Sequence, residues 1–319
     1  MGSTADKTYA DDYKIARLDK IRLADLARLH ESVYRVTPAH DHFQRKYDTR
    51  YAGVENVGFV AYDVAGKPVA FYGVIPCFIQ FGDQIVLAAQ SADTMTHSDY
   101  RNKGLFLKLA RMTFDLCREV GIKVVFGFPN QNSHRGLEKL GWVTTEVMER
   151  FSVPVKALPL ESLSSKFKWT RSIYDSYATS ALRKYFYSKQ GLTNSVIGAN
   201  CGGVYRDEKY LRYKTYSSSQ VMQLGPCKIW YKIQNGFVIG DMEAVTANNF
   251  ETTIAELKKI CRRLGVREIN FQVSPGTLLA ELFREKVLPT PSFPVMFLDL
   301  GSNLDFSKIK FTLADIDIF

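Results

Sequence analysis

The sequence predicts an α/β protein with a mixed sheet, built as two domains in tandem. A strand, turn, helix, strand, turn and helix follow one another over residues 91–142. Three strands in hairpin order precede that segment, and a similar order of strands and helices returns in the second half of the chain. Strands that alternate with amphipathic helices are typical of sheets covered by helices.

The central helix is predicted from Leu105 to Val120, directly after a basic turn. Apolar residues recur at spacings of three and four through Leu105, Leu109, Met112, Leu116 and Val120. This period buries one face of the helix and leaves the charged face in water. Gly121 stands at the C′ position, where the chain needs a positive φ, and a buried strand is expected from Ile122 to Phe128.

The turn itself reads Arg101-Asn102-Lys103-Gly104 and feeds the N-terminus of this helix. The first N–H groups of a helix have no partners within it, and the helix dipole adds positive potential there. With two cations and a glycine that permits close approach, the turn is suited to a phosphate or pyrophosphate. A plain surface turn is the alternative that the same pattern leaves open.

Two segments carry a resemblance to a known family. Thr96 to Leu105 resembles motif A of the GNAT acyl-CoA N-acyltransferases, whose signature is Arg/Gln-x-x-Gly-x-Gly/Ala after a strand. Asn130-Gln131-Asn132-Ser133 to Lys139-Leu140-Gly141-Trp142 resembles motif B, in which an asparagine leads a helix that ends in Lys-Leu-Gly-aromatic. The resemblance covers about Val57 to Arg150 and implies a GNAT fold, acyltransferase activity and acetyl-CoA as cofactor.

The sequence departs from the family pattern at two positions. The last motif A position, usually Gly or Ala, is Phe106, whose side chain must turn away from the cofactor. The motif B tyrosine, which in the family often protonates the departing thiolate, falls at Leu137. Leucine has no proton to give. Another residue or water must then do so, or this copy does not catalyse.

The resemblance also implies site residues. The cofactor-binding residues expected from it are Thr94, Met95, Thr96, Arg101, Asn102, Lys103, Gly104, Leu105, Phe106, Asn130 and Ser133. A base must take a proton from the acceptor ammonium. Asp93 is the nearest acid to the strand end, while His97, Glu146 and Glu149 are weaker candidates.

The C-terminal carboxylate of Phe319 is a second catalytic candidate, because the tandem survival-protein enzymes of this family use theirs. A loose tail is the alternative for these last residues.

The acceptor pocket is expected at residues 35–53, which read as a polar and aromatic loop after a helix over Ile21–Tyr34. Tyr34, His40, His42 and Tyr47 are the candidate substrate-binding residues. A metal site is not predicted, because His40 and His42 alternate on a loop with no third ligand nearby. Residues 1–12 are polar and expected to be frayed.

The remaining elements define the domain boundaries. Strands are expected over Val57–Asp63, Val69–Gln80, Gln84–Thr96 and Thr144–Val155. Residues 1–155 form the predicted GNAT domain with the acyl-CoA site, 156–190 a linker with a bridging helix over Trp169–Gln190, and 191–319 a degenerate GNAT-like domain that shapes the acceptor cleft. In the last part, strands are expected over Cys227–Ile233, Gly236–Ala244, Glu268–Val273 and Pro294–Leu300, and helices over Phe250–Leu264 and Thr277–Glu285.

Composition narrows the class of protein further. The chain has 319 residues, 46% hydrophobic and 24% charged, as expected of a soluble globular protein. No apolar run is long enough to span a membrane and no signal peptide is evident, so a cytoplasmic location is expected. Five widely spaced cysteines indicate reduced, mostly buried thiols. The net charge of +9 suits an anionic cofactor, substrate, lipid or nucleic acid, but no helix carries the basic aromatic stripe expected of a nucleic-acid binder.

Three functions stay open on the sequence. The first is an acetyl-CoA-dependent N-acetyltransferase acting on the primary amine of a small polar acceptor, such as an amino sugar or sugar nucleotide. The second is the same chemistry on a peptide or protein amine. The third is an acyl-CoA-binding regulatory protein without catalysis. A basic cluster in the linker (Lys156, Lys166, Lys168, Arg171, Arg183, Lys184 and Lys189) is interpreted as a solvated face.

Overall fold

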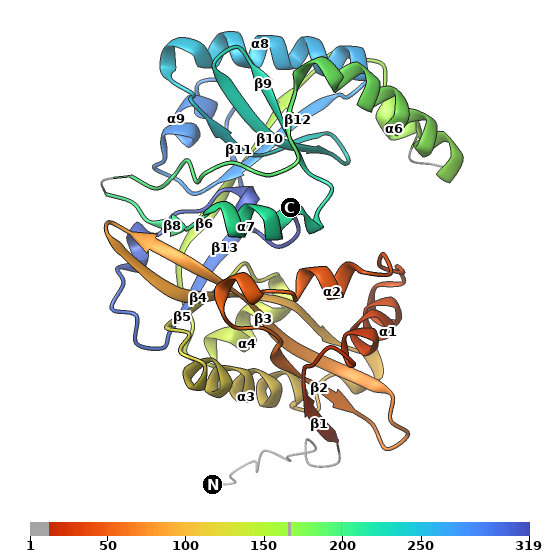
Figure 1. Cartoon of the computed structure of the whole chain (residues 1–319), viewed down its shortest axis with the longest axis vertical. Coiled ribbons are helices and arrows are strands. Elements are labelled where there is room, and N and C mark those ends of the chain that lie inside the picture. The colour runs from red at the N-terminus through yellow and green to blue at the C-terminus, as the bar shows by residue number, and fades with distance from the viewer. Residues whose placement is uncertain (1–12, 165–166, 199) are drawn as a thin grey trace, which may run out of the picture. The chain divides into compact units, whose positions relative to one another are not determined.

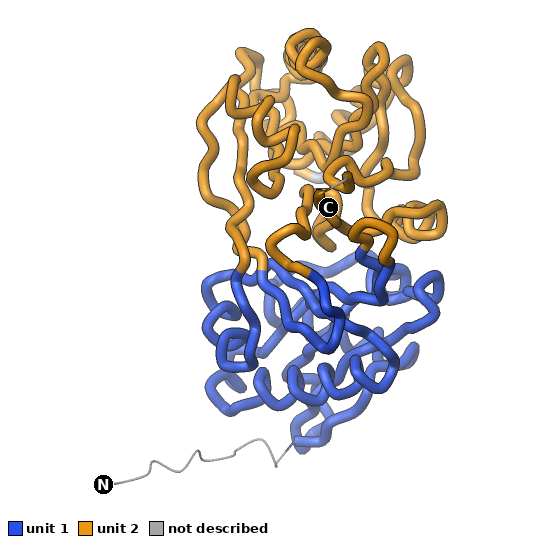
Figure 2. Tube along the Cα trace, turned by 90° about the vertical axis from the view of Figure 1, so that its left-hand side faces the viewer, with its two compact units in different colours: residues 1–79, 85–144, 296–304 blue, residues 80–84, 145–295, 305–319 orange. Residues whose placement is uncertain are grey.

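The computed structural model describes residues 13–164, 167–198 and 200–319. The chain divides into two compact units, shown in separate colours in Figure 2. Unit 1 comprises residues 1–79, 85–144 and 296–304, and unit 2 comprises residues 80–84, 145–295 and 305–319. Each unit is therefore assembled from segments that lie far apart in the sequence. None of the helices in the described ranges is both long and apolar enough to cross a membrane.

Unit 1 is a mixed sheet covered by helices (Figure 1). Its strands lie in the order β1-β2-β3-β4-β5, and the end of β13 lies beyond β5. The strands are β1 Lys14–Arg17, β2 Val57–Tyr62, β3 Pro68–Phe81, β4 Gln84–Thr96, β5 Val124–Gly127 and β13 Thr290–Asp299. The helices are α1 Leu23–Tyr34, α2 His42–Lys46, α3 Leu105–Glu119 and α4 Gln131–Glu138, with single 3-10 turns at Arg50–Ala52 and Ser98–Tyr100.

The central helix is confirmed almost to the residue. Leu105, Leu109, Leu116 and other apolar side chains of α3 are buried in the core of unit 1. Gly121 has φ 85°, and the N–H of Ile122 returns to the carbonyl of Cys117, which ends the helix as predicted. Strand β5 lies parallel to β4 and antiparallel to β13, so both of its edges are paired.

In unit 2 the strands lie in the order β6-β12-β11-β10-β9-β7. The strands are β6 Val143–Pro154, β7 Phe186–Ser188, β9 Gln220–Leu224, β10 Cys227–Ile233, β11 Phe237–Glu243 and β12 Glu268–Val273, with the two-residue β8 Gly203–Val204 off this path. The helices are α5 Leu160–Ser164, α6 Lys168–Leu182, α7 Glu208–Tyr213, α8 Ala247–Leu264 and α9 Leu278–Arg284; the 3-10 turns are Arg183–Tyr185, Lys214–Tyr216, Phe306–Lys308 and Leu313–Asp315.

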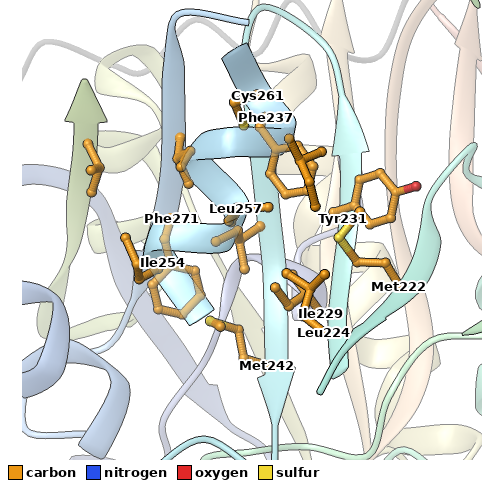
Figure 3. Packing of buried hydrophobic residues seen from close by; sticks show 14 of the residues in the cluster. Met222, Leu224, Ile229, Tyr231, Phe237, Met242, Ile254, Leu257, Cys261 and Phe271 are labelled. Carbon is orange, nitrogen blue, oxygen red and sulfur yellow. The ribbon is translucent and has the colours of Figure 1, made fainter. Parts of the chain in front are cut away.

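The core of unit 2 lies between α8 and the sheet, where Ile254, Leu257 and Cys261 of the helix pack against Phe271, Met242 and their neighbours (Figure 3). Phe237 stacks on Tyr231 with the ring planes 8° apart. All five cysteines are free thiols, and Cys201 is the one that is not fully buried.

The predicted helices and strands of the second half are present, with shifted ends. The bridging helix expected to reach Gln190 ends at Leu182 and is followed by the edge strand β7. Strands β1, β7, β8 and β9 and helices α2, α5 and α7 were not predicted. β6 runs on from unit 1 into unit 2, where it pairs with β12, so the compact units do not divide at residue 155.

The end of the chain is buried in unit 2. Arg206 is fully buried between the carboxylates of Asp241 and Asp315, at 2.6 and 2.7 Å. Its guanidinium also donates to the Thr312 hydroxyl at 2.8 Å. Because each buried charge has a partner, this cluster fixes the final turn of the chain in place.

Candidate active site

Strand β4 extends beyond its neighbour β5 at the end where the sequence predicts the cofactor site. In the described part of the chain, the pairs between β4 and β5 join Ala88–Gln90 to Val124–Phe126 and go no further. Residues 91–96 extend beyond them, with Asp93 in the left-handed region at φ 51°. A non-glycine residue at positive φ interrupts a regular strand and re-aims its peptide groups. The edge of β4 at Thr94–Thr96 can therefore offer backbone groups to an extended ligand.

Asp93 is held in this conformation by helix α2. The Nζ of Lys46 lies 2.8 Å from each carboxylate oxygen of Asp93, and the Tyr47 hydroxyl donates to the same group at 3.1 Å. The side chains of Lys46 and Tyr47 are buried. The carboxylate of this candidate base thus already accepts a hydrogen bond from the Lys46 ammonium. It can take a proton from a substrate only by giving up or sharing that hydrogen bond.

The basic turn has the geometry of an anion site. Asn102 and Gly104 have φ values of 60° and 77°, and α3 begins at Leu105 with no side-chain cap among the described residues. The first N–H groups of α3 are therefore available to a ligand. An anion there would be stabilised by the helix dipole of a 15-residue helix.

The charges of the turn are positioned by its neighbours. Arg101 is exposed, and its Nε donates to the Thr96 carbonyl at 3.4 Å. Lys103 lies over the Tyr100 ring, 4.8 Å from its centroid. The Tyr100 hydroxyl donates to Asp63 at 2.8 Å, which raises the pKa of the tyrosine and ties the turn to the hairpin between β2 and β3.

The side chain of Phe106 packs against the core of unit 1, away from the predicted cofactor site. Its ring lies 5.6 Å from that of Tyr72, and a Cβ on Gly136 would come within 2.6 Å of it. Helix α4 can cross at this point because residue 136 has no side chain. Leu137, at the family's tyrosine position, is buried in the core of unit 1 and cannot supply a proton.

The predicted motif B residues serve the start of α4. The Asn130 side-chain oxygen accepts from the backbone N–H groups of Asn132 and Ser133, at 2.9 and 3.2 Å. The Ser133 hydroxyl donates to the Asn130 carbonyl at 3.3 Å. Asn130 is thus an N-cap, and cofactor contact by Asn130 and Ser133 remains a prediction.

The expectation of a loop at 35–53 is wrong, because α2 and a 3-10 turn form there. Tyr47 is buried and its hydroxyl donates to Asp93, and substrate contact by Tyr47 remains a prediction. Tyr34 is exposed at the end of α1 and packs on His30 at 4.8 Å, while the His42 ring contacts Phe43 at 5.1 Å. The spacing of four residues between Phe43 and Tyr47 is compatible with a short helix, but two positions alone do not establish a helical period.

Phe319 does not lie in a loose tail. Its ring is fully buried in unit 2, 5.5 Å from that of Trp230, and it covers Gly240. Lys232 donates to the Ile318 carbonyl at 2.6 Å, and Lys214 to that of Ile316 at 2.7 Å. A catalytic role for the terminal carboxylate remains a prediction.

The weaker base candidates on β6 are ion-paired in unit 2. Glu146 pairs with Lys310 and Glu149 with Arg284. Lys46 lies within residues 35–53, which the sequence predicts as a polar loop, whereas the structure makes it the buried partner of Asp93.

The fold is that of an α/β protein in which a basic turn precedes the N-terminus of α3, beside the end of strand β4. Residues 14–145 match the family model described as "Acetyltransferase (GNAT) domain". The sequence matches no curated protein. Residues 14–145 therefore form a GNAT acetyltransferase domain.

Solved structures with a similar fold agree with this assignment. A probable N-acyltransferase of unknown function from Enterococcus faecalis has a TM-score of 0.61 at 12% identity, covering 91% of this chain and 73% of its own. GCN5-related N-acetyltransferases from Kribbella flavida and Anabaena variabilis have TM-scores of 0.58 and 0.56, each at 14% identity. The match covers 91% and 90% of this chain, respectively, and 73% of each of theirs. At these identities the likeness establishes the fold.

Proposed function

We propose that the protein is an acetyl-CoA-dependent N-acetyltransferase that acts on the primary amine of a small polar acceptor, such as an amino sugar or sugar nucleotide. The uncapped N-terminus of α3, with Arg101 and Lys103 on its approach, is the observation that carries the proposal. The pyrophosphate of CoA would bind the N–H groups from Asn102 to Phe106. The pantetheine arm would run along Thr94–Thr96.

The reaction is a direct transfer. The neutral amine attacks the thioester carbonyl, the C–N bond forms, the C–S bond breaks, and CoA leaves as a thiolate that takes a proton. A backbone N–H of β4 would polarise the carbonyl. Asp93, directly before that segment, would accept the amine proton through water, because its own oxygens are engaged by Lys46 and Tyr47.

Unit 2 supports the assignment of a single cofactor site. There, β11 and β12 are parallel with α8 between them, as β4 and β5 are with α3. At the start of α8, however, the Thr246 N–H donates to the Asn249 side chain at 2.9 Å within a capping box. The capping box of α8 thus gives hydrogen-bond partners from the helix's own first turn to backbone N–H groups at its start, whereas α3 has no such cap. We therefore propose that unit 2 is a degenerate GNAT-like copy without its own cofactor.

Calorimetric titration with acetyl-CoA and with CoA tests the site. We expect micromolar binding to the intact chain and a loss of at least about a hundredfold in Gly104→Glu, because a carboxylate would face the pyrophosphate. Gly66→Glu is the matched control: both glycines have φ 77° and open space around them, so the backbone strain is equal. Equal affinities in the two variants would overturn the placement of the cofactor.

Turnover tests the chemistry. Thiol release from acetyl-CoA with a panel of amino sugars, polyamines and peptides should identify an acceptor, and Asp93→Asn should lower kcat by about a hundredfold or more while CoA affinity stays unchanged. The buried Leu137 favours a second candidate, a protein that binds acyl-CoA without catalysis. Tight CoA binding with no turnover on any amine would select it.

A further inference from the structure

Exposed apolar side chains gather in one short part of unit 2. Among the described residues, nineteen large hydrophobic side chains are exposed, and nine of them lie between residues 158 and 187. They are Leu158, Leu160, Leu163, Phe167, Trp169, Ile173, Tyr177, Phe186 and Tyr187. Single exposed apolar residues are ordinary, but such a concentration marks an interaction surface.

Helix α6 carries three of these side chains, Trp169, Ile173 and Tyr177. Tyr174, Ala178 and Leu182 face the core of unit 2, which fixes how the helix is rotated. Trp169, Ile173 and Tyr177 recur every four residues on another face, with Trp169 67% and Ile173 61% exposed. Figure 1 shows α6 on the outside of its unit, beside α8.

The helix is anchored, so the exposed stripe is not a sign of a loosely packed segment. The Tyr177 hydroxyl donates to the Arg263 carbonyl of α8 at 2.7 Å. Thr170 donates to the Ser164 carbonyl at 2.8 Å and ties α5 to α6. Trp169 and Ile173 therefore stay in water because the unit holds them there.

The same stretch is strongly basic. Residues 156–189 contain seven lysines and arginines against two acids, Glu161 and Asp175. Both acids pair with one residue, Arg171, at 3.2 and 2.9 Å. Arg183, Lys184 and Lys189 are exposed, and no carboxylate in the described part of the chain lies within ion-pair distance of them. A large part of the chain's net charge of +9 is thus concentrated beside the exposed aromatic residues.

We propose that this surface, centred on Trp169 and Ile173 of α6, binds an anionic lipid bilayer. Tryptophan, tyrosine and basic side chains are typical of segments that lie in the headgroup region, with apolar groups inserted and cations on anionic lipids. Base stacking would use the aromatic side chains alone, whereas the four aliphatic ones (Leu158, Leu160, Leu163 and Ile173) suit acyl chains, so the mixture favours lipid over nucleic acid. A second copy of the chain would place this basic surface against itself, so like charges disfavour a dimer through it.

Vesicle binding of the full chain tests the proposal. We expect sedimentation with vesicles that contain phosphatidylglycerol, not with pure phosphatidylcholine, and release by salt. Trp142 and Trp230 are 4% and 1% exposed, so Trp169 alone of the three tryptophans should respond. Its fluorescence should shift to the blue and be quenched by brominated lipid.

Substitutions locate the surface. Trp169→Ser and Ile173→Ser should each weaken vesicle binding about tenfold, whereas Ile21→Ser, at an even more exposed site in unit 1, should not. Lys184→Gln should weaken it about fivefold and the exposed Lys209→Gln should leave it unchanged.

Three results would overturn the proposal. The first is no binding to anionic vesicles. The second is binding that Trp169→Ser leaves intact. The third is a dimer in solution that Trp169→Ser dissociates, which would assign the surface to a second copy of the chain. None of these results depends on CoA binding or turnover.

Discussion

Replacing Lys46 with methionine should open the site region of unit 1. Lys46 is 3% exposed and Asp93 15%, and their atoms lie 2.8 Å apart. Methionine keeps most of the side-chain length but removes the ammonium group. The Tyr47 hydroxyl then remains to donate to the Asp93 carboxylate. Breaking a buried ion pair from one side costs about 3–5 kcal/mol, and the partial exposure of Asp93 places this case near the lower end.

Native-state hydrogen exchange of peptides from β4 is the assay, because a chain of two units need not unfold in one step. A loss of about 3 kcal/mol corresponds to exchange roughly a hundredfold faster for amides that open with this region. The exposed Lys123→Met is the control and should leave these rates unchanged. The double variant Lys46→Met/Asp93→Asn should recover much of the loss, since a neutral amide needs no counter-charge.

Exchange within threefold of the parent rate in Lys46→Met would refute this reasoning. It would mean that water or backbone donors already satisfy Asp93, and that α2 does not hold the left-handed residue of β4 in place.

Three further predictions concern unit 2 and the thiols. Burial raises the pKa of Cys117 and of Cys261 to about 12, above the unfolded value near 9. The free energy of unfolding should therefore be unaffected below about pH 9 and fall between pH 9 and 12, by up to about 1.4 kcal/mol per thiol and pH unit. Urea titrations of the parent should show this fall, and those of the double alanine variant should not. Gly240→Ala places a Cβ about 2.3 Å from the Phe319 ring and should cost about 1–3 kcal/mol, a loss that Phe319→Ala relieves in thermal unfolding; equal loss in both backgrounds would contradict the docked tail. Arg206→Met leaves two buried carboxylates without their cation and should cost about 3–5 kcal/mol by the same assay, and a change under 1 kcal/mol would contradict the assigned cluster.

Much of the fold around the candidate site could be predicted because its signals are local. The period of α3, the positive φ at Gly121 and the apolar run of β5 all depend on neighbours a few residues away. The repeated order of strands and helices in the second half was visible for the same reason. Local patterns did not predict α2, because its five residues are too few to show a clear helical period of apolar residues.

By itself, the sequence determined the basic turn, the helix behind it and the leucine at the family's tyrosine position. Tertiary structure alone decided which partners meet across the chain. Lys46 reaches Asp93 over 47 residues, Phe319 covers Gly240, and residues 296–304 return to unit 1. Such contacts arise from packing free energy summed over a whole unit, and no spacing within a short window encodes them.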